Sequence, residues 1–177
     1  MDKKIEVAVI IGSDSDLPVV SETLKLFDKF KVEYSINVAS AHRTPALVKE
    51  CVKQAVSKGV KVFIAAAGMS AALPGVVASE TILPVIGIPI DGKNLSSMDA
   101  LFSIAQMPPS IPVACVSIGK AGAVNAAVLA LQILALNNEN ISEKLLKYKE
   151  DVAKIIMEKN KRLKDIGYVK YIEGMKK

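Results

Sequence analysis

Short runs of apolar, largely β-branched residues alternate along the chain with segments in which apolar residues recur every three or four positions. The first run, residues 5–11, is almost continuously apolar, which is typical of a strand buried on both faces of a parallel sheet. Residues 17–30 then place apolar side chains on one face of a helix, and Pro18 suits the first turn of that helix, where a missing N–H costs little. The pattern predicts a strand and a helix joined by a short turn.

Similar signals recur as far as residue 136. The predicted strands are residues 5–11, 34–39, 61–66, 84–88 and 113–118. The predicted helices are residues 17–30, residues 45–57 with Thr44 as N-cap, a short helix after the loop 67–75, and residues 97–105 and 123–136. Five strands that alternate with helices predict a doubly wound α/β domain.

A last helical pattern runs from residue 141 to about residue 163, with lysines outside its apolar positions. We therefore expect an α/β domain at residues 1–140 and an amphipathic helical extension of the same domain at residues 141–177, placed at a subunit interface. Residues 1–140 carry equal numbers of basic and acidic side chains, so the net charge of +5 lies in the extension. Because the signs there are mixed on a helical pattern, we expect a solvated helix face and no nucleic-acid partner.

The apolar content is high, at 51% with a mean hydropathy of +0.34. It comes in short runs, none of which reaches the roughly 18–20 apolar residues of a membrane span, so we expect no membrane partner. Extra apolar surface in a chain of this size suggests contact between subunits. Cys51 and Cys115 form no CxxC pair, so we expect them to be reduced and buried as small hydrophobic residues in a cytoplasmic protein.

Polar side chains gather in the loops that follow the first three strands. Ligands of open α/β sheets bind beyond the carboxyl ends of the strands, so these loops are the expected site. In the loop Gly12–Asp16, backbone N–H groups at a helix N-terminus suit a phosphate, and the aspartates suit sugar hydroxyls. The alternative is helix capping by Ser15 or Asp16. The loop matches neither GxGxxG nor GxxxxGK[ST], which excludes the common dinucleotide and P-loop motifs.

The second loop holds His42, the only histidine of the 177 residues, next to Arg43. Imidazole is the side chain whose unperturbed pKa lies near neutrality, so His42 is the candidate proton carrier. Arg43 can clamp a phosphate or a carboxylate with its planar fork. The alternatives are a plain surface histidine, a surface arginine paired with an acid, and a weak metal site formed with Asp14 and Asp16.

The third loop, residues 68–75, has small residues that allow a ligand to approach the backbone, although a tight packing loop would look the same. Together the three loops predict a small phosphorylated metabolite as ligand, with one histidine to move a proton.

Several motifs make the chain resemble the PurE family of purine biosynthesis from about residue 5 to residue 136. The motifs in this sequence are Gly12-Ser13-Asp14-Ser15-Asp16, Ser40-Ala41-His42-Arg43-Thr44-Pro45, Leu73-Pro74-Gly75, Gln106-Met107-Pro108, Ile111-Pro112-Val113, Gly119-Lys120-Ala121-Gly122 and Asn125-Ala126-Ala127. Arginine in the second motif resembles the class I form, N5-carboxyaminoimidazole ribonucleotide mutase. This enzyme moves a carboxylate from the exocyclic nitrogen to ring carbon C4, which gives 4-carboxy-5-aminoimidazole ribonucleotide.

The resemblance implies a flavodoxin-like, three-layer αβα fold with a five-stranded parallel sheet and a long C-terminal helix, assembled as a homo-octamer. It implies a small-molecule ribonucleotide substrate and neither metal nor organic cofactor. His42 would be the general acid–base, which protonates N5 as CO2 leaves and then removes the C4 proton. The implied substrate-binding residues are Ser13, Asp16, Arg43, Ser40, Gly68 and Leu73.

The third loop departs from the family pattern GGAAHLPG. Ala72 stands where the family has a second histidine, and Met69-Ser70 replaces Gly-Ala. The resulting Gly-x-Ser pattern is slightly more similar to the class II loop. The alternative function is therefore an aminoimidazole ribonucleotide carboxylase that uses free CO2. A non-catalytic nucleotide-binding module is a third hypothesis, disfavoured because it would have little use for the His42–Arg43 pair.

Overall fold

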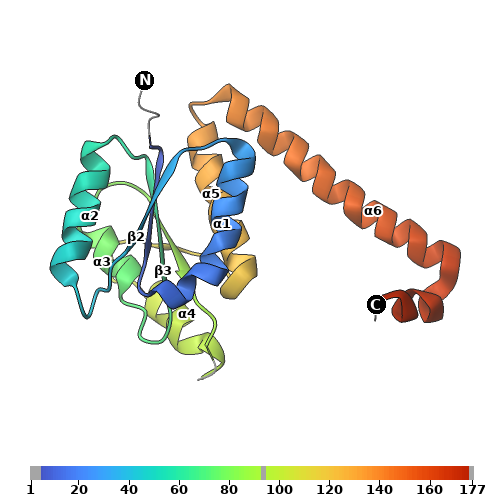
Figure 1. Ribbon diagram of the computed structural model, residues 1–177, viewed down its shortest axis with the longest axis horizontal. Coiled ribbons are helices and arrows are strands. Elements are labelled where there is room, and N and C mark those ends of the chain that lie inside the picture. The colour runs from blue at the N-terminus through green and yellow to red at the C-terminus, as the bar shows by residue number, and fades with distance from the viewer. Residues whose placement is uncertain (1–4, 93–94, 176–177) are drawn as a thin grey trace. The chain divides into compact units, whose positions relative to one another are not determined.

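The computed structural model describes residues 5–92 and 95–175 (Figure 1). The chain forms two compact units, Met1–Leu134 and Ala135–Lys177. In the described residues, no helix combines the length and the apolar character that a bilayer crossing needs.

The first unit is built on a parallel five-stranded sheet in the order β2-β1-β3-β4-β5. Its strands are β1 (Val7–Ile11), β2 (Tyr34–Val38), β3 (Val62–Ala67), β4 (Val85–Pro89) and β5 (Ala114–Cys115). Val9 of β1 lies opposite Ile36 of β2 on one side and Ile64 of β3 on the other. This is the flavodoxin-like strand order, so the predicted fold class is confirmed.

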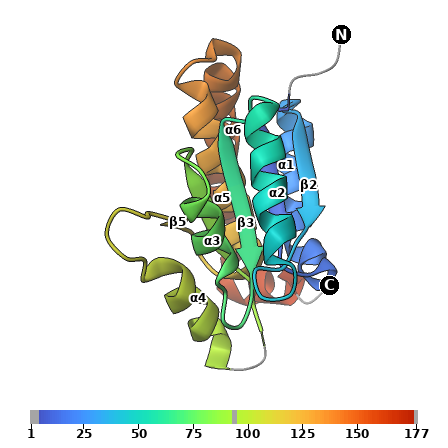
Figure 2. The same ribbon diagram turned by 90° about the vertical axis from the view of Figure 1, so that its left-hand side faces the viewer.

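Helices cover both faces of this sheet (Figures 1 and 2). The helices of this unit are α1 (Leu17–Phe30), α2 (Pro45–Ser57), α3 (Leu73–Ser79), α4 (Met98–Ala105) and α5 (Gly119–Ala135), with short 3-10 turns η1 (Asp14–Asp16) and η2 (Leu95–Ser97). On one face, Ile10 and Phe63 join a buried cluster with residues of α2, α3 and α4. On the other face α1 adjoins α5, where the Thr23 hydroxyl donates a hydrogen bond of 2.7 Å to the Ala123 carbonyl.

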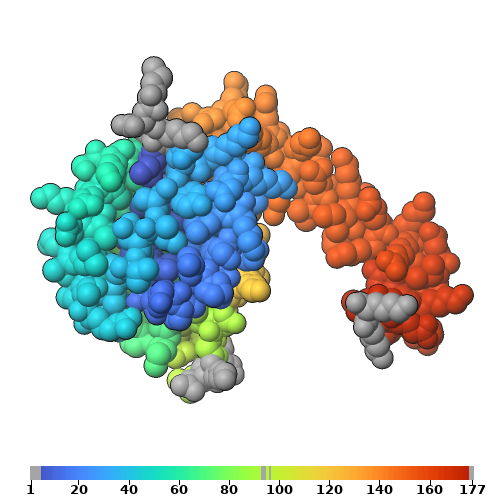
Figure 3. Space-filling view, viewed as in Figure 1, coloured from blue at the N-terminus to red at the C-terminus, as the bar shows by residue number. Residues whose placement is uncertain are grey.

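The central strands are fully buried, as their continuous apolar runs predict. The edge strand β2 differs, since its residues are half-buried or exposed and Ile36 and Val38 reach the surface. The space-filling view shows this side of the first unit, formed by the segments coloured blue to cyan (Figure 3).

The fifth strand is shorter than predicted, with two residues in place of the six at 113–118. Among the described strands it pairs with β4 alone, at the edge of the sheet. The connector before it contains three prolines, which have no backbone N–H to donate to a neighbouring strand. Cys115 is consequently half-buried, which corrects the prediction that it is buried, whereas Cys51 is buried as expected. Because the strand ends early, α5 begins at Gly119 rather than at residue 123.

The second unit contains α6 (Glu139–Met175), which is longer than the predicted 141–163. The Asn138 side chain caps its start, since the Ile141 N–H donates to Asn138 Oδ1 at 3.2 Å. Gly167 interrupts the helix with φ 72° and ψ 161°. Apolar residues continue past this break, and Val169 and Ile172 are both exposed.

Candidate active site

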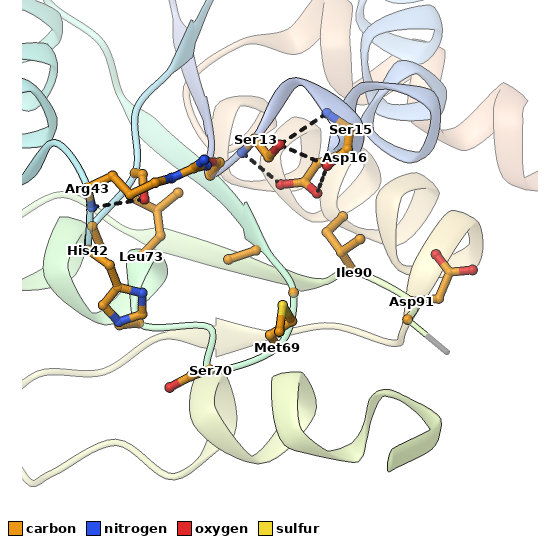
Figure 4. A pocket seen from close by; sticks show the side chains of 17 residues that line it. Ser13, Ser15, Asp16, His42, Arg43, Met69, Ser70, Leu73, Ile90 and Asp91 are labelled. Atoms are coloured by element: carbon orange, nitrogen blue, oxygen red, sulfur yellow. Dashed lines mark hydrogen bonds between the residues drawn. The ribbon is translucent and has the colours of Figure 1, made fainter. Parts of the chain in front are cut away.

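A pocket opens beyond the carboxyl ends of β1, β2, β3 and β4 (Figure 4). Its volume of about 650 Å³ is typical of a site for a small ligand. The chain reverses its direction across the sheet between β1 and β3, which is where ligands of such folds bind. The pocket brings together all seven residues singled out from the sequence, namely Ser13, Asp16, Ser40, His42, Arg43, Gly68 and Leu73.

The loop after β1 is a turn capped by Ser13. Its Oγ accepts a hydrogen bond of 3.3 Å from the Ser15 N–H, and its own N–H donates to Asp16 Oδ2 at 3.1 Å. The α1 helix has no side-chain cap of its own. Asp16 occupies the N-cap position of α1, as one alternative had it, but its side chain makes no bond to that helix. The Asp16 carboxylate instead completes a capping box with Ser13, which caps the preceding 3-10 turn.

The Asp16 side chain is buried at the floor of this loop, with the residue only 7% exposed. Burial raises the pKa of its carboxyl above the usual 3.8, because desolvation penalises the charged form. The hydrogen bonds from Ser13 and Ser15 and the charge of Arg43 act in the opposite direction, while Asp14 adds to the rise. The result is a carboxyl held in one orientation beside the pocket.

The loop after β2 is folded on itself by Thr44. Its Oγ1 accepts from the Ser40 N–H at 2.9 Å and donates to the Ser40 carbonyl at 3.2 Å. Thr44 occupies the N-cap position of α2 as predicted, but its side chain makes no capping bond to the helix because it is engaged with Ser40. The Arg43 N–H in turn donates to Ser40 Oγ at 3.2 Å, so Ser40 organises the loop.

Arg43 links the second loop to the first. Its Nη2 donates a hydrogen bond of 3.1 Å to the Gly12 carbonyl. This bond uses one of the five guanidinium donors, which leaves the others to bind an anion in the pocket. The cation is thereby placed next to the Ser13 turn, in which the N–H groups of Ser13, Ser15 and Asp16 already donate to acceptors of the turn itself.

The neighbouring His42 is exposed and lines the pocket. Within the described chain its ring makes no hydrogen bond or ion pair, in contrast to a histidine held by a carboxylate in a triad. Both ring nitrogens are thus free to meet a ligand (Figure 4).

The loop after β3 contributes Gly68, Met69 and Ser70, and Leu73 closes the wall from the start of α3. A Cβ placed on Gly68 would meet Ile90 atoms at 3.6–3.8 Å, which is ordinary contact. The described packing around Gly68 therefore does not require glycine at this position.

The loop after β4 supplies Ile90, Asp91 and Gly92, which the sequence motifs did not indicate. The sequence did contain a weaker indication, because this segment follows a predicted strand, as the other three loops do. Asp91 adds a second carboxylate to the pocket, on a different wall from Asp16 (Figure 4).

This arrangement suits a ligand with an anionic end and hydroxyl groups. The Arg43 guanidinium can bind the anion, and Asp16 can accept hydrogen bonds from hydroxyls. His42 can transfer a proton at the ligand's other end. In the part of the chain that the structure describes, no three His, Cys, Asp or Glu side chains are grouped as a metal site would need.

The AIR carboxylase family matches residues 6–154 of this chain. A protein of Pyrococcus abyssi named N5-carboxyaminoimidazole ribonucleotide mutase is 51% identical over 169 residues, which are 96% of each chain. A Candida glabrata phosphoribosylaminoimidazole carboxylase is 43% identical over 172 residues, which are 97% of this chain and 30% of that protein.

The fold agrees with these matches. A crystal structure of Treponema denticola PurE superposes with a TM-score of 0.82 at 30% identity, covering 89% of this chain and 98% of that one. The family match, the identity over nearly the whole length and the shared fold all confirm the resemblance inferred from the loop motifs. The chain therefore belongs to the AIR carboxylase family.

Proposed function

We propose that this protein is an N5-carboxyaminoimidazole ribonucleotide mutase of purine biosynthesis. The observation that supports it most strongly is the meeting of Arg43, Asp16 and His42 in one pocket, with Arg43 tied to Gly12 of the first loop. The Pyrococcus abyssi relative with this name aligns over almost all of both chains, which favours the same activity here.

In the proposed complex the ribonucleotide phosphate lies against Arg43 and the Ser13 turn. The ribose hydroxyls donate to the Asp16 carboxylate, and Ser40, Gly68 and Leu73 line the volume for the imidazole ring. The Ser13–Asp16 hydrogen bond holds the two groups in place before the ligand arrives, which lowers the entropy lost on binding.

His42 carries the proton transfers. The bond from N5 to its carboxylate breaks, the electron pair stays on nitrogen, and N5 takes a proton from His42 as CO2 leaves. The electrons of ring carbon C4 then form the new bond to CO2, and the neutral imidazole takes the C4 proton. One proton is given and one is recovered, so no co-reactant is consumed.

A substrate comparison tests this function. The protein is offered either N5-carboxyaminoimidazole ribonucleotide or aminoimidazole ribonucleotide with bicarbonate, and initial rates are compared. A mutase turns over the first faster. Faster turnover of the second would identify the CO2-dependent carboxylase instead.

The His42→Asn variant separates an enzyme from a binding module. Because His42 makes no hydrogen bond within the described chain, we expect its replacement to leave folding and ribonucleotide affinity nearly unchanged. Loss of a general acid–base typically lowers the rate by about 10²–10⁴-fold. Calorimetric titration measures the affinity and product formation measures the rate; a variant as active as the wild type would refute the catalytic role.

We further propose that residues 1–140 form the catalytic domain, that residues 141–177 extend it at a subunit interface, and that the assembly is a cytoplasmic homo-octamer. Exposed apolar residues on both units support contact between subunits, among them Ile36, Val38, Ile82, Ile155 and Ile156.

A further inference from the structure

Met69 combines two unusual features at the mouth of the pocket. Its backbone adopts the left-handed conformation, with φ of 58°, which non-glycine residues rarely occupy. Its side chain is 71% exposed although it is long and apolar. Strained backbone of this kind persists only where the surroundings impose it, and it is often found at sites that bind ligands.

The loop around Met69 is anchored on both sides. Gly68 before it lies against Ile90, and after it the Ala72 N–H donates to the Ser70 carbonyl at 2.8 Å. Ala71 is 1% exposed. The backbone of Met69 is therefore fixed by its neighbours, and not by the packing of its own side chain.

Nothing in the fold of this chain calls for a methionine here. Glycine would adopt the same backbone without strain, and the core would lose no buried side chain. The Met69 side chain instead adds apolar surface to the wall of the pocket. We therefore expect this side chain to matter when a ligand fills the pocket.

The side chain is placed for that contribution. In Figure 4, Ser13 and Asp16 lie at one edge of the pocket, and His42, Met69 and Ser70 lie at the opposite edge. A ribonucleotide held by Ser13, Asp16 and Arg43, with its reacting ring near His42, would come within reach of Met69. An unbranched thioether can adapt to the shape of such a ligand.

We propose that Met69 closes the pocket over the bound ribonucleotide and keeps the released CO2 beside the ring. This inference rests on the proposed mutase function. The bond from N5 to the carboxylate breaks and the C4 bond forms later, so a neutral, weakly polar molecule is free between the two steps. An apolar cover without hydrogen-bonding groups excludes water and raises the effective concentration of CO2 at C4.

An isotope experiment measures the retention of CO2. The substrate carries ¹³C in its N5 carboxylate, and unlabelled bicarbonate with carbonic anhydrase supplies competing CO2. The wild type should keep the label in the product. In Met69→Gly we expect the label lost to solvent to rise about tenfold, and in Met69→Leu to return near the wild-type value, because an apolar cover is restored.

Lys31→Gly is the matched control for backbone strain. Lys31 has the same φ of 58° but lies at the end of α1, away from the residues that line the pocket. Both glycine variants should unfold at a higher temperature than the wild type, while only Met69→Gly should lose label. Equal label retention in Met69→Gly and the wild type would overturn the proposal that Met69 closes the pocket. If the wild type fails to convert the substrate, the mutase function is refuted, and the methionine oxidation described next tests closure of the pocket by itself.

Methionine oxidation tests closure without catalysis. Hydrogen peroxide oxidises exposed thioethers, and mass spectrometry reports each methionine separately. With aminoimidazole ribonucleotide bound, oxidation of Met69 should slow by about fivefold or more, because its sulfur becomes covered. Met157 on α6, which is not among the residues lining the pocket, serves as the internal control and should oxidise at the same rate with and without the ribonucleotide. Equal oxidation of Met69 with and without the ribonucleotide overturns the proposal.

Discussion

Among single residues, the pocket depends on side chains that are already oriented before a ligand binds. Asp16 is fixed by the Ser13 N–H, and Arg43 by the Gly12 carbonyl. His42 is the exception, since no partner in the described chain orients its ring. The proposed binding groups are thus preorganised, whereas the ring of the proposed proton carrier is not held in one orientation by the described chain.

Asp16 gives a pH-dependent prediction for stability. Burial raises its pKa above 3.8 in the folded chain, so as pH rises past this value the unfolded chain ionises first and the folded state loses stability. Asp16→Asn removes the titration and can keep the acceptor for the Ser13 N–H. We expect the free energy of unfolding of the wild type, relative to the variant, to fall as the pH rises past 3.8.

Chemical denaturation at several pH values measures this difference. Asp99→Asn is the control, because Asp99 lies on α4, outside this turn, and is not among the groups that shift the pKa of Asp16. A difference that grows with pH would mean that the hydrogen bonds and the Arg43 charge outweigh desolvation at Asp16.

Among the helices, strands and turns, the connection between β5 and α5 is one of the tightest in the fold. A Cβ on Gly122 would run into the backbone carbonyl of Ser117, which no side-chain movement can relieve. Asn125 Nδ2 adds a hydrogen bond of 3.3 Å to Ser117 Oγ across the same turn. The Gly119-Lys120-Ala121-Gly122 motif therefore has a packing role at its last glycine.

We predict that Gly122→Ala destabilises the first unit by about 2–4 kcal/mol, because the backbone must shift to admit the methyl group. Gly92→Ala is the control, since no described residue that the substitution would have to displace lies within 4 Å of the position that its Cβ would take. Thermal denaturation followed by circular dichroism compares the two. Similar unfolding temperatures for both variants would contradict the packing argument.

Across the molecule as a whole, apolar side chains remain exposed on both units. On the second unit they follow one another along α6, where Val152, Ile155 and Ile156 are 45%, 49% and 59% exposed. A helix with such a face is stable in water mainly when a partner covers it. This supports the proposed role of residues 141–177 in assembly.

Assembly is predicted to weaken when this face is altered. Deletion after Leu136 removes α6, and Ile155→Glu places a charge on its apolar face. Light scattering coupled to size exclusion should show smaller particles for both variants. Lys159→Glu is the control on the same helix, and a truncated chain that stays octameric would refute the role of the extension.

Much of the first unit follows from local sequence. Continuous apolar runs at β1 and β3 indicate strands buried on both faces, and Pro18 and Pro45 mark helix starts. The departures occur where long-range pairing overrides local preference. Residues 113–118 have the composition of a strand, but only two of them pair with β4.

The α/β class, the three polar loops and the family could all be inferred from the amino-acid sequence, because periodicity and short motifs are local properties of the chain. The folded chain determined which groups meet. It brought the β4 loop with Asp91 into the pocket, buried the Asp16 carboxyl beside it, and set Met69 in a left-handed conformation. These outcomes depend on the order of strands in the sheet and on contacts between loops distant in sequence, which no local pattern encodes.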